Sequence, residues 1–131
     1  MSDKMFSSAK DLKEGRYVLI DDIPCRVVQI EISKSGKHGG AKMRIVAIGV
    51  FDGQKKTLLT PGDQDVDVPI IERRNVLIMS INGKTAQVMD NDDPSLNYDI
   101  EIPEDLIANA EAGKEAEVLQ AMGRRKIERI K

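Results

Sequence analysis

Two apolar runs and the glycine-rich segment between them, CRVVQIEI (25–32), SKSGKHGGAK (33–42) and MRIVAIGVF (43–51), decide the fold. In the first run, polar Gln29 and Glu31 alternate with apolar residues, and the second run is rich in β-branched residues. Two such runs joined by a glycine-rich segment predict a β-hairpin with a long loop. The loop is therefore the first candidate for a functional element.

The composition of this loop singles out Lys37. Gly36 precedes it, and Gly39 and Gly40 follow closely. Because glycine permits positive φ and has no side chain to crowd its neighbours, we expect Lys37 to be held away from the body of the protein. The segment 32–51 has no acidic residue, and its basic residues are Lys34, Lys37, His38, Lys42 and Arg44. We hypothesise that the loop is the functional element of the protein and that Lys37 is its key residue.

Length and composition limit the remaining possibilities. The 131 residues fit one domain or two small ones, and the single Cys25 excludes an internal disulfide and a multi-cysteine zinc site. The first residues are not followed by an apolar run, and no apolar stretch approaches the ~20 residues that span a bilayer. We therefore expect a cytoplasmic protein. A net charge of −2 argues against nucleic-acid binding over the whole surface.

The first half of the chain predicts a small half-open β-barrel. Residues 1–15 resemble a loose lead-in, and Asp63, Asp65 and Asp67 resemble a solvated turn. Short strands are expected at 17–20, 23–32, 43–51 and 56–59, with a turn at Asp21-Asp22. Pro69 marks a boundary because proline stiffens a connector. We therefore expect two domains, 1–69 and 70–131.

The second half predicts an OB-fold, because its elements follow the order three strands, one short helix, two strands. The strands are expected at 76–81, 85–89, 96–102, 116–122 and 126–130. Asn82-Gly83 favours a type I′ turn between the first two. Pro103 is suited to the first turn of the helix, and Gly113 is expected to end it. The whole chain is then an all-β protein of two small barrels.

Catalytic and metal sites receive little support. A phosphate-binding loop would need glycine at position 31 and serine or threonine at 38, where the chain has Glu31 and His38. His38 has no carboxylate or cysteine partner in the loop, so no metal site is expected. The alternating aspartates at 63–67 lack the glycine and glutamate of an EF-hand. We expect no enzyme activity, although a Schiff-base amine at Lys37 stays open as an alternative.

For the basic loop, a solvated hairpin is the more common explanation of such a charge run, and RNA binding is the functional alternative. Lysines on a loop neutralise phosphates at little steric cost. A second basic patch follows near the C-terminus, formed by Arg124, Arg125, Lys126 and Arg129. Tyr98 alone is no stacking platform and is expected in the core. A general RNA-binding module that works through the OB-fold therefore stays open as a second reading.

The segment 33–42 is similar to the modification loop of the translation initiation factor 5A family, the hypusine-containing proteins of archaea and eukaryotes. In that family the pattern is Ser-Lys-Thr-Gly-Lys-His-Gly-His-Ala-Lys. The later Asp67-Val68-Pro69 matches the family's interdomain segment. The resemblance extends over almost the whole chain. Ser35 and Gly40 depart from the eukaryotic pattern, which indicates an archaeal type.

The resemblance implies an SH3-like barrel that carries the loop, followed by an OB-fold. It implies that Lys37 receives an aminobutyl group from spermidine through deoxyhypusine synthase, giving deoxyhypusine or hypusine, with no other cofactor. Gly36, His38, Gly39 and Gly40 would shape the presentation of Lys37, while Lys34, Lys42 and Arg44 would assist it in contacting RNA.

The family's role, by the same resemblance, is to bind the ribosome beside peptidyl-tRNA and to promote slow peptide bonds, notably at proline runs, as bacterial elongation factor P does. We expect Lys37→Ala to leave folding intact, since a side chain at a loop tip buries little.

Overall fold

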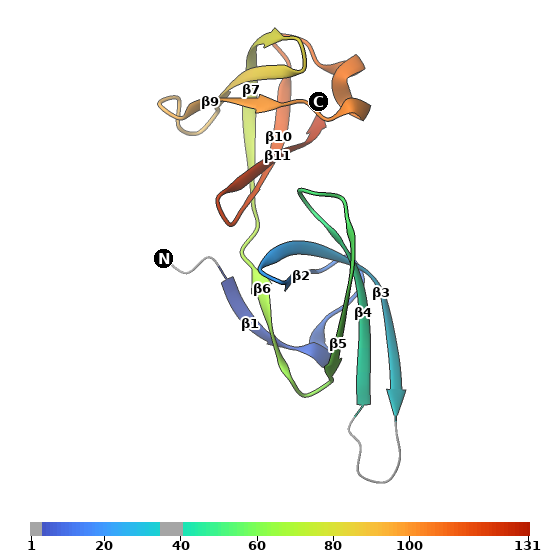
Figure 1. Cartoon of the computed structure of the whole chain (residues 1–131). Coiled ribbons are helices and arrows are strands. Elements are labelled where there is room, and N and C mark those ends of the chain that lie inside the picture. The colour runs from blue at the N-terminus through green and yellow to red at the C-terminus, as the bar shows by residue number, and fades with distance from the viewer. Residues whose placement is uncertain (1–3, 35–40) are drawn as a thin grey trace. The chain divides into compact units, whose positions relative to one another are not determined.

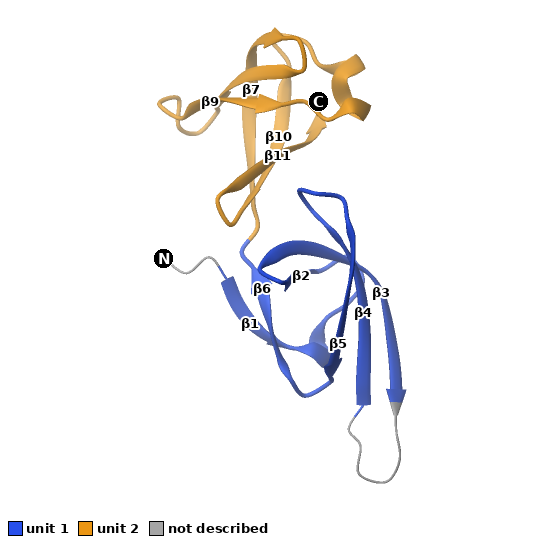
Figure 2. Cartoon of the chain, viewed as in Figure 1, with its two compact units in different colours: residues 1–70 blue, residues 71–131 orange. Residues whose placement is uncertain are grey.

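The protein is built almost entirely of antiparallel β-strands. A computed structural model describes residues 4–34 and 41–131 (Figure 1). The chain divides into two compact units, residues 1–70 and 71–131 (Figure 2). The boundary predicted after Pro69 falls one residue before the division between these units. The all-β prediction is confirmed.

The first unit holds a four-stranded antiparallel sheet in the order β2-β3-β4-β5 and a two-stranded sheet of β1 and β6. Its elements are β1 (Lys4–Ser8), the 3-10 helix η1 (Ala9–Asp11), β2 (Tyr17–Ile20), β3 (Ile23–Lys34), β4 (Ala41–Gly49), β5 (Lys55–Pro61) and β6 (Asp65–Pro69). Small and aliphatic side chains from both sheets form its core, among them Val18, Val27, Met43 and Ile45. This is the SH3-like half of the fold.

Cys25 belongs to the same core. Its side chain is fully buried, and its thiol donates a hydrogen bond to the carbonyl oxygen of Ile23 at 3.2 Å. Burial raises the pKa of the Cys25 thiol. The thiol therefore remains protonated at neutral pH.

The second unit is an OB-fold. Its elements are β7 (Glu72–Asn82), β8 (Thr85–Asp90), β9 (Asn97–Glu101), the 3-10 helix η2 (Glu104–Asn109), β10 (Glu115–Ala121) and β11 (Arg124–Ile130). The sheet order is β11-β10-β7-β8-β9, and β11 also contacts β9, which closes the barrel. The core includes Val76, Ile78, Val88, Val118 and Ile127.

A buried ion pair fixes one end of this barrel. Asp90, the last residue of β8, is 1% exposed and accepts a hydrogen bond from Nε of Arg74 at 2.8 Å. Its other carboxylate oxygen accepts the backbone N–H groups of Asp92 and Asp93 at 2.8 and 3.0 Å. The Arg74 hydrogen bond is the main cause that lowers the pKa of Asp90, in spite of its burial. The carboxylate thus connects β7, β8 and the following loop.

Four sequence predictions are wrong in detail, three about secondary-structure elements and one about the conformation of a turn. The lead-in at 1–15 contains β1, whose partner β6 lies about sixty residues away, and adjacent Met5 and Phe6 are both exposed, so no alternation marks the strand. Asp65 and Asp67 belong to β6 rather than to a turn. The helix after Pro103 ends at Asn109. Gly113 therefore does not end the helix. It lies just before β10, and its N–H donates a hydrogen bond to the Ile78 carbonyl oxygen.

The two-residue hairpin turns differ from one another in their backbone conformation. Asp21 and Asp22 both have positive φ, as a type I′ turn requires. Between β7 and β8 the turn residues are Gly83 and Lys84, because Asn82 pairs with Thr85. Gly83 has φ of 64°, and among the residues that the structure describes neither Asn82 nor Lys84 has positive φ. The turn is therefore not the type I′ turn predicted for Asn82-Gly83, since its positive φ falls only on the first central residue.

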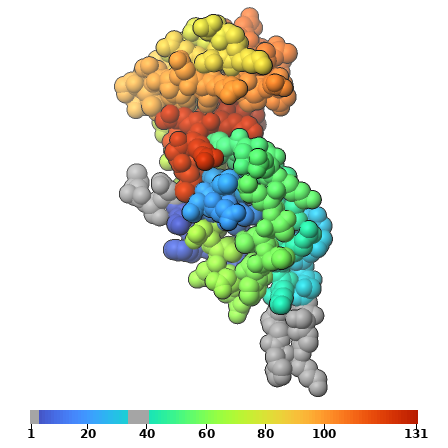
Figure 3. All heavy atoms as spheres, viewed as in Figure 1, coloured from blue at the N-terminus to red at the C-terminus, as the bar shows by residue number. Residues whose placement is uncertain are grey.

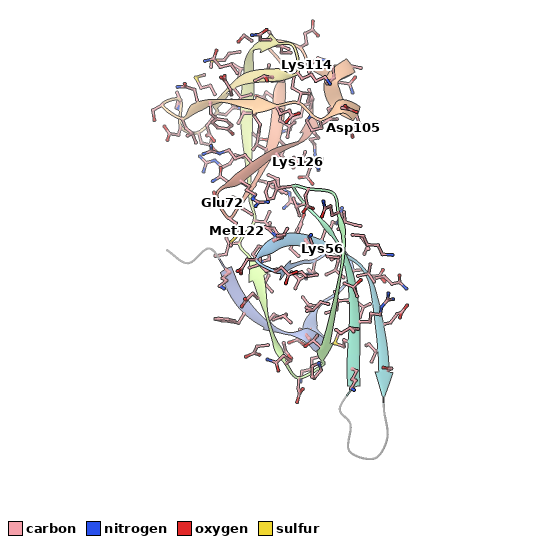
Figure 4. All side chains as sticks on the ribbon, in the orientation of Figure 1. Lys56, Glu72, Asp105, Lys114, Met122 and Lys126 are labelled. Atoms are coloured by element: carbon pink, nitrogen blue, oxygen red, sulfur yellow. The ribbon has the colours of Figure 1, made fainter. Side chains whose placement is uncertain are left out.

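Met122 occupies a strained position in the β10–β11 turn (Figure 4), with φ of 51°. A side chain with a plain methylene at Cβ is unfavourable there, whereas asparagine tolerates this region. We expect Met122→Asn to raise the free energy of unfolding by about 1 kcal/mol. Urea denaturation measures this, and Met122→Leu, which keeps the strain, is the matched control with no expected gain. Equal stability of the asparagine and leucine variants would contradict the strain.

Membrane-spanning helices and clustered metal ligands are both absent from the described residues, 4–34 and 41–131. No helix there is long and apolar enough to cross a membrane. No group of three or more histidine, cysteine, aspartate or glutamate side chains in those ranges is placed to hold a metal ion.

Candidate functional site

The hairpin of β3 and β4 carries the candidate loop. Its antiparallel ladder runs from Cys25 opposite Gly49 to Lys34 opposite Ala41. One extra residue, Val28, forms a bulge between Val27 and Gln29. Beyond the bulge, β3 and β4 remain paired up to the residues that bound the loop. The loop therefore starts from a hairpin with a fixed register.

The sequence-predicted residues Gly36, Lys37, His38, Gly39 and Gly40 lie outside the described residues. Lys34 is the last described residue of β3, and Lys42 and Arg44 lie on β4. Lys42 and Arg44 are two positions apart, so their exposed side chains point to the same face of the sheet. Both cations are thus placed close to the base of the loop.

The core and β5 hold the C-terminal base of the loop in place. Met43 and Ile45, which alternate with the two exposed cations, are buried in the core of the first unit. The backbone N–H of Gly62, just after β5, donates to the Ala41 carbonyl oxygen at 2.8 Å. The Gly62 carbonyl oxygen in turn accepts from the hydroxyl of Ser8 at 3.1 Å. The first residue of β4 is therefore tied to two other parts of the barrel.

An acidic residue opposes one of these cations. Glu31 lies directly across from Arg44 in the ladder, with 3.5 Å between a carboxylate oxygen and a guanidinium nitrogen. Both side chains are about half exposed, so the pair contributes little to stability. Glu31 lies just outside the acid-free segment 32–51, and only the cross-strand register brings it to Arg44. Lys42 is opposite Ser33 instead.

A hollow of about 600 Å³ lies at the base of the loop. It is lined by residues of β3, β4 and β5: Glu31, Ile32, Ser33, Lys42, Met43, Arg44, Leu59, Thr60 and Pro61. Ile32 is 62% exposed and Leu59 is 73% exposed, which is unusual for aliphatic residues within strands. In the space-filling view, the teal-to-green surface of β4 and β5 extends down to where the described chain stops (Figure 3). Sequence reasoning missed both residues, because apolar residues in a strand ordinarily indicate core.

The second basic patch is more heavily paired than the sequence suggested. Arg129 lies 3.6 Å from a carboxylate oxygen of Glu117, which also lies 3.7 Å from Arg73. Arg73 lies 3.4 Å from Glu128 as well. Arg124, Arg125 and Lys126 are exposed at the start of β11. The patch is therefore concentrated at the N-terminal end of β11.

Tyr98 lies partly in the core, as expected, but it also contacts this patch. The guanidinium carbon of Arg125 lies 4.2 Å from the centre of the Tyr98 ring. Burial is the main cause that raises the pKa of the Tyr98 hydroxyl, so it stays neutral at physiological pH. The two residues are far apart in the sequence, and only the closure of the barrel brings them together.

Two family models together match nearly the whole chain. Residues 2–64 match the model described as "Translation initiation factor 5A-like, N-terminal". Residues 70–131 match the model described as "Eukaryotic elongation factor 5A hypusine, DNA-binding OB fold".

Curated relatives and solved structures agree with these models. The chain is 48% identical over 123 residues to translation initiation factor 5A of Methanocella arvoryzae, covering 94% of this chain and 95% of the relative. It is 51% identical over 126 residues to that of Pyrobaculum islandicum, covering 92% and 93%.

The structure of eukaryotic translation initiation factor 5A from Methanococcus jannaschii superposes with a TM-score of 0.92 at 40% identity, covering 100% of this chain and 97% of that one. A family protein from Naegleria fowleri gives 0.80 at 29% identity, covering 99% of both chains. The hairpin that carries the loop, the two barrels and these matches together place the chain in the translation initiation factor 5A family.

Proposed function

We propose that the chain is a translation factor that binds the ribosome beside peptidyl-tRNA and promotes slow peptide-bond formation, notably at proline runs, through a modified Lys37. The observation that carries this proposal is the hairpin itself. A register-fixed ladder, secured by buried Met43 and Ile45, ends at the segment that holds Lys37. A hairpin whose register is fixed in this way supports precise placement of one long cationic side chain.

The modification proposed for Lys37 follows from the chemistry of spermidine. The bond between the secondary nitrogen of spermidine and its four-carbon arm breaks, and the same carbon forms a bond to Nζ of Lys37. The proton of Nζ passes to the departing nitrogen, so that 1,3-diaminopropane leaves. Lys37 gains an aminobutyl group and a second amine further from the backbone. Deoxyhypusine synthase is the proposed enzyme, and a later hydroxylation would give hypusine.

In this proposal the protein acts without catalytic turnover of its own and in the cytoplasm. The longer side chain positions the acceptor end of peptidyl-tRNA and places positive charge beside it. Lys34, Lys42 and Arg44 contact RNA phosphates around the loop, while Gly36, His38, Gly39 and Gly40 leave room for the modifying enzyme and then for the target. The exposed side chains of Lys42 and Arg44 on one face of β4 support this assignment.

An intact mass of the protein purified from its own source tests the modification, with the Lys37 peptide sequenced by fragmentation. We expect a mass gain of one aminobutyl group on Lys37, with or without one oxygen. Protein produced in a bacterial host that also produces the synthase serves as the matched sample for comparison with the native material. Unmodified Lys37 in native material would remove the basis of the proposal.

A second candidate is a general RNA-binding module that works through the OB-fold. The exposed cations at the N-terminal end of β11 favour it. Salt-dependent binding to unstructured RNA that survives Lys37→Ala, and that is lost when Arg124, Arg125 and Lys126 are neutralised together, would support this candidate.

A further inference from the structure

Three side chains of the second barrel, Tyr98, Arg125 and Gln120, meet at the guanidinium of Arg125. Tyr98 of β9 packs against the core, and the guanidinium of Arg125 from β11 lies over its ring at 4.2 Å. Nε of Arg125 donates a hydrogen bond to the side-chain oxygen of Gln120 on β10 at 2.9 Å. Arg125 and Gln120 are direct cross-strand partners. The guanidinium of Arg125 is therefore held by an aromatic ring and by a hydrogen-bond acceptor.

Arg125 is an exposed residue even though its guanidinium lies over the Tyr98 ring. Arginine ordinarily loses considerable side-chain entropy when it is immobilised, and here the protein has already restricted it. A planar cation that is held in place and still reaches solvent suits a planar, electron-rich ligand.

The neighbours of Arg125 indicate the class of ligand. Arg124 and Lys126 flank Arg125 on β11 and are exposed, and Met122 belongs to the turn that precedes β11 (Figure 4). OB-folds bind oligonucleotides over the face of their second and third strands and at two loops, which correspond here to β8 and β9 and to the β7–β8 and β10–β11 turns. Unpaired RNA bases stack on guanidinium planes as well as on aromatic rings.

We propose that Tyr98, Arg125 and Gln120 form a stacking site for one unpaired base of single-stranded RNA. The base lies on the open face of the Arg125 guanidinium, while Arg124 and Lys126 meet the flanking phosphates. The site belongs to the second unit alone and does not depend on Lys37 or its modification. It gives the second candidate function a defined location.

Acidic residues near this site limit how much of the binding energy comes from charge. Arg74 is paired with Asp90 at 2.8 Å and lies 4.0 Å from Glu72, so its charge is already opposed. Asp92 and Asp93 are exposed in the loop after β8. Because the proposal assigns one phosphate each to Arg124 and Lys126, the logarithm of the binding constant should fall with the logarithm of salt concentration with a slope of about −1.4.

Fluorescence anisotropy of the full chain with labelled octaadenylate tests the proposal, with an abasic ribose-phosphate octamer as the comparison probe. We expect the wild type to bind octaadenylate about tenfold more tightly than the abasic octamer. Arg125→Lys keeps the charge and loses the plane, so it should reduce octaadenylate affinity about fivefold or more and leave the abasic probe unchanged. Tyr98→Phe keeps the ring and should bind as the wild type does.

Two further variants separate this site from the loop and from a purely structural role. Lys37→Ala tests the loop: octaadenylate affinity that falls in Lys37→Ala and not in Arg125→Lys would place the RNA-binding site on the loop and overturn the proposal. Arg124→Ala should weaken both probes equally and make the salt slope shallower. Thermal denaturation verifies that each variant is folded. Equal affinity of the wild type for both probes, or wild-type binding by Arg125→Lys, would overturn the stacking site.

Discussion

Replacing Lys37 with arginine is expected to abolish the activity of the factor while the protein remains folded. Arginine keeps a positive charge, but its guanidinium has no lysine amine to accept the aminobutyl group. The side chain would then end well short of the aminobutyl-lysine that we propose. Lys37→Ala should show the same loss. The measurement is the rate of peptide-bond formation at a run of prolines on ribosomes supplied with each variant after exposure to the modifying enzyme.

The matched control for this result is Lys42→Arg, an exchange of the same two residue types on β4 at the base of the same loop. Its charge survives and no modification is expected there, so it should keep most of the activity. Circular dichroism and thermal denaturation show whether each variant is folded. Full activity of Lys37→Arg would mean that charge alone suffices and that modification of this residue is not the mechanism.

Removal of the Asp90 carboxylate is expected to reduce the free energy of unfolding by about 3 kcal/mol. Asp90→Ala leaves Arg74 without its 2.8 Å partner and leaves two loop N–H groups without their acceptor. Arg74 is partly exposed and regains some hydration, which places the loss at the lower end for a broken buried ion pair. Urea denaturation at neutral pH measures it. Asp99→Ala, at an exposed position on β9, is the control and should change stability by less than about 0.5 kcal/mol.

The same carboxylate predicts how stability depends on pH. The folded state lowers the pKa of Asp90, mainly through Arg74, so the ionised form is favoured by folding. Its contribution is therefore complete above the unfolded pKa of about 3.9 and is lost as the pH falls through the lower folded pKa. Below pH about 4 the wild type should lose stability more steeply than Asp90→Asn, which cannot titrate. Parallel curves would show that Asp90 is not the titrating group.

The sequence predicted the strands whose side chains alternate or whose turns carry clear signals. The runs 17–20 and 85–89 recur as β2 and β8, and Asp21-Asp22 does form a turn. Prediction from the sequence failed for β1, because both Met5 and Phe6 are exposed and the partner strand is distant in the chain. Strand pairing across such distances is a tertiary property, so no local pattern reports it.

The residues of the candidate site also differ in whether a local sequence pattern reveals them. Lys37 and its glycines stand out through composition alone, and they stay a prediction because they lie outside the described residues. The Glu31–Arg44 pair, the exposed Leu59 and the Tyr98–Arg125 contact depend on register and on barrel closure. A sequence supplies the candidates for such contacts, but it does not show which residues the sheet places side by side.

The buried thiol of Cys25 makes this chain convenient for site-specific fluorescent labelling. The sequence holds no other cysteine, and this one is fully buried, hydrogen-bonded and shifted toward the protonated form. Maleimide dyes react with accessible thiolates, so the native protein should label slowly while it is folded. A cysteine introduced at exposed Ser33, at the foot of the loop, would then carry the dye almost alone. The arrival of the loop at its target could be followed in real time without first removing the native cysteine.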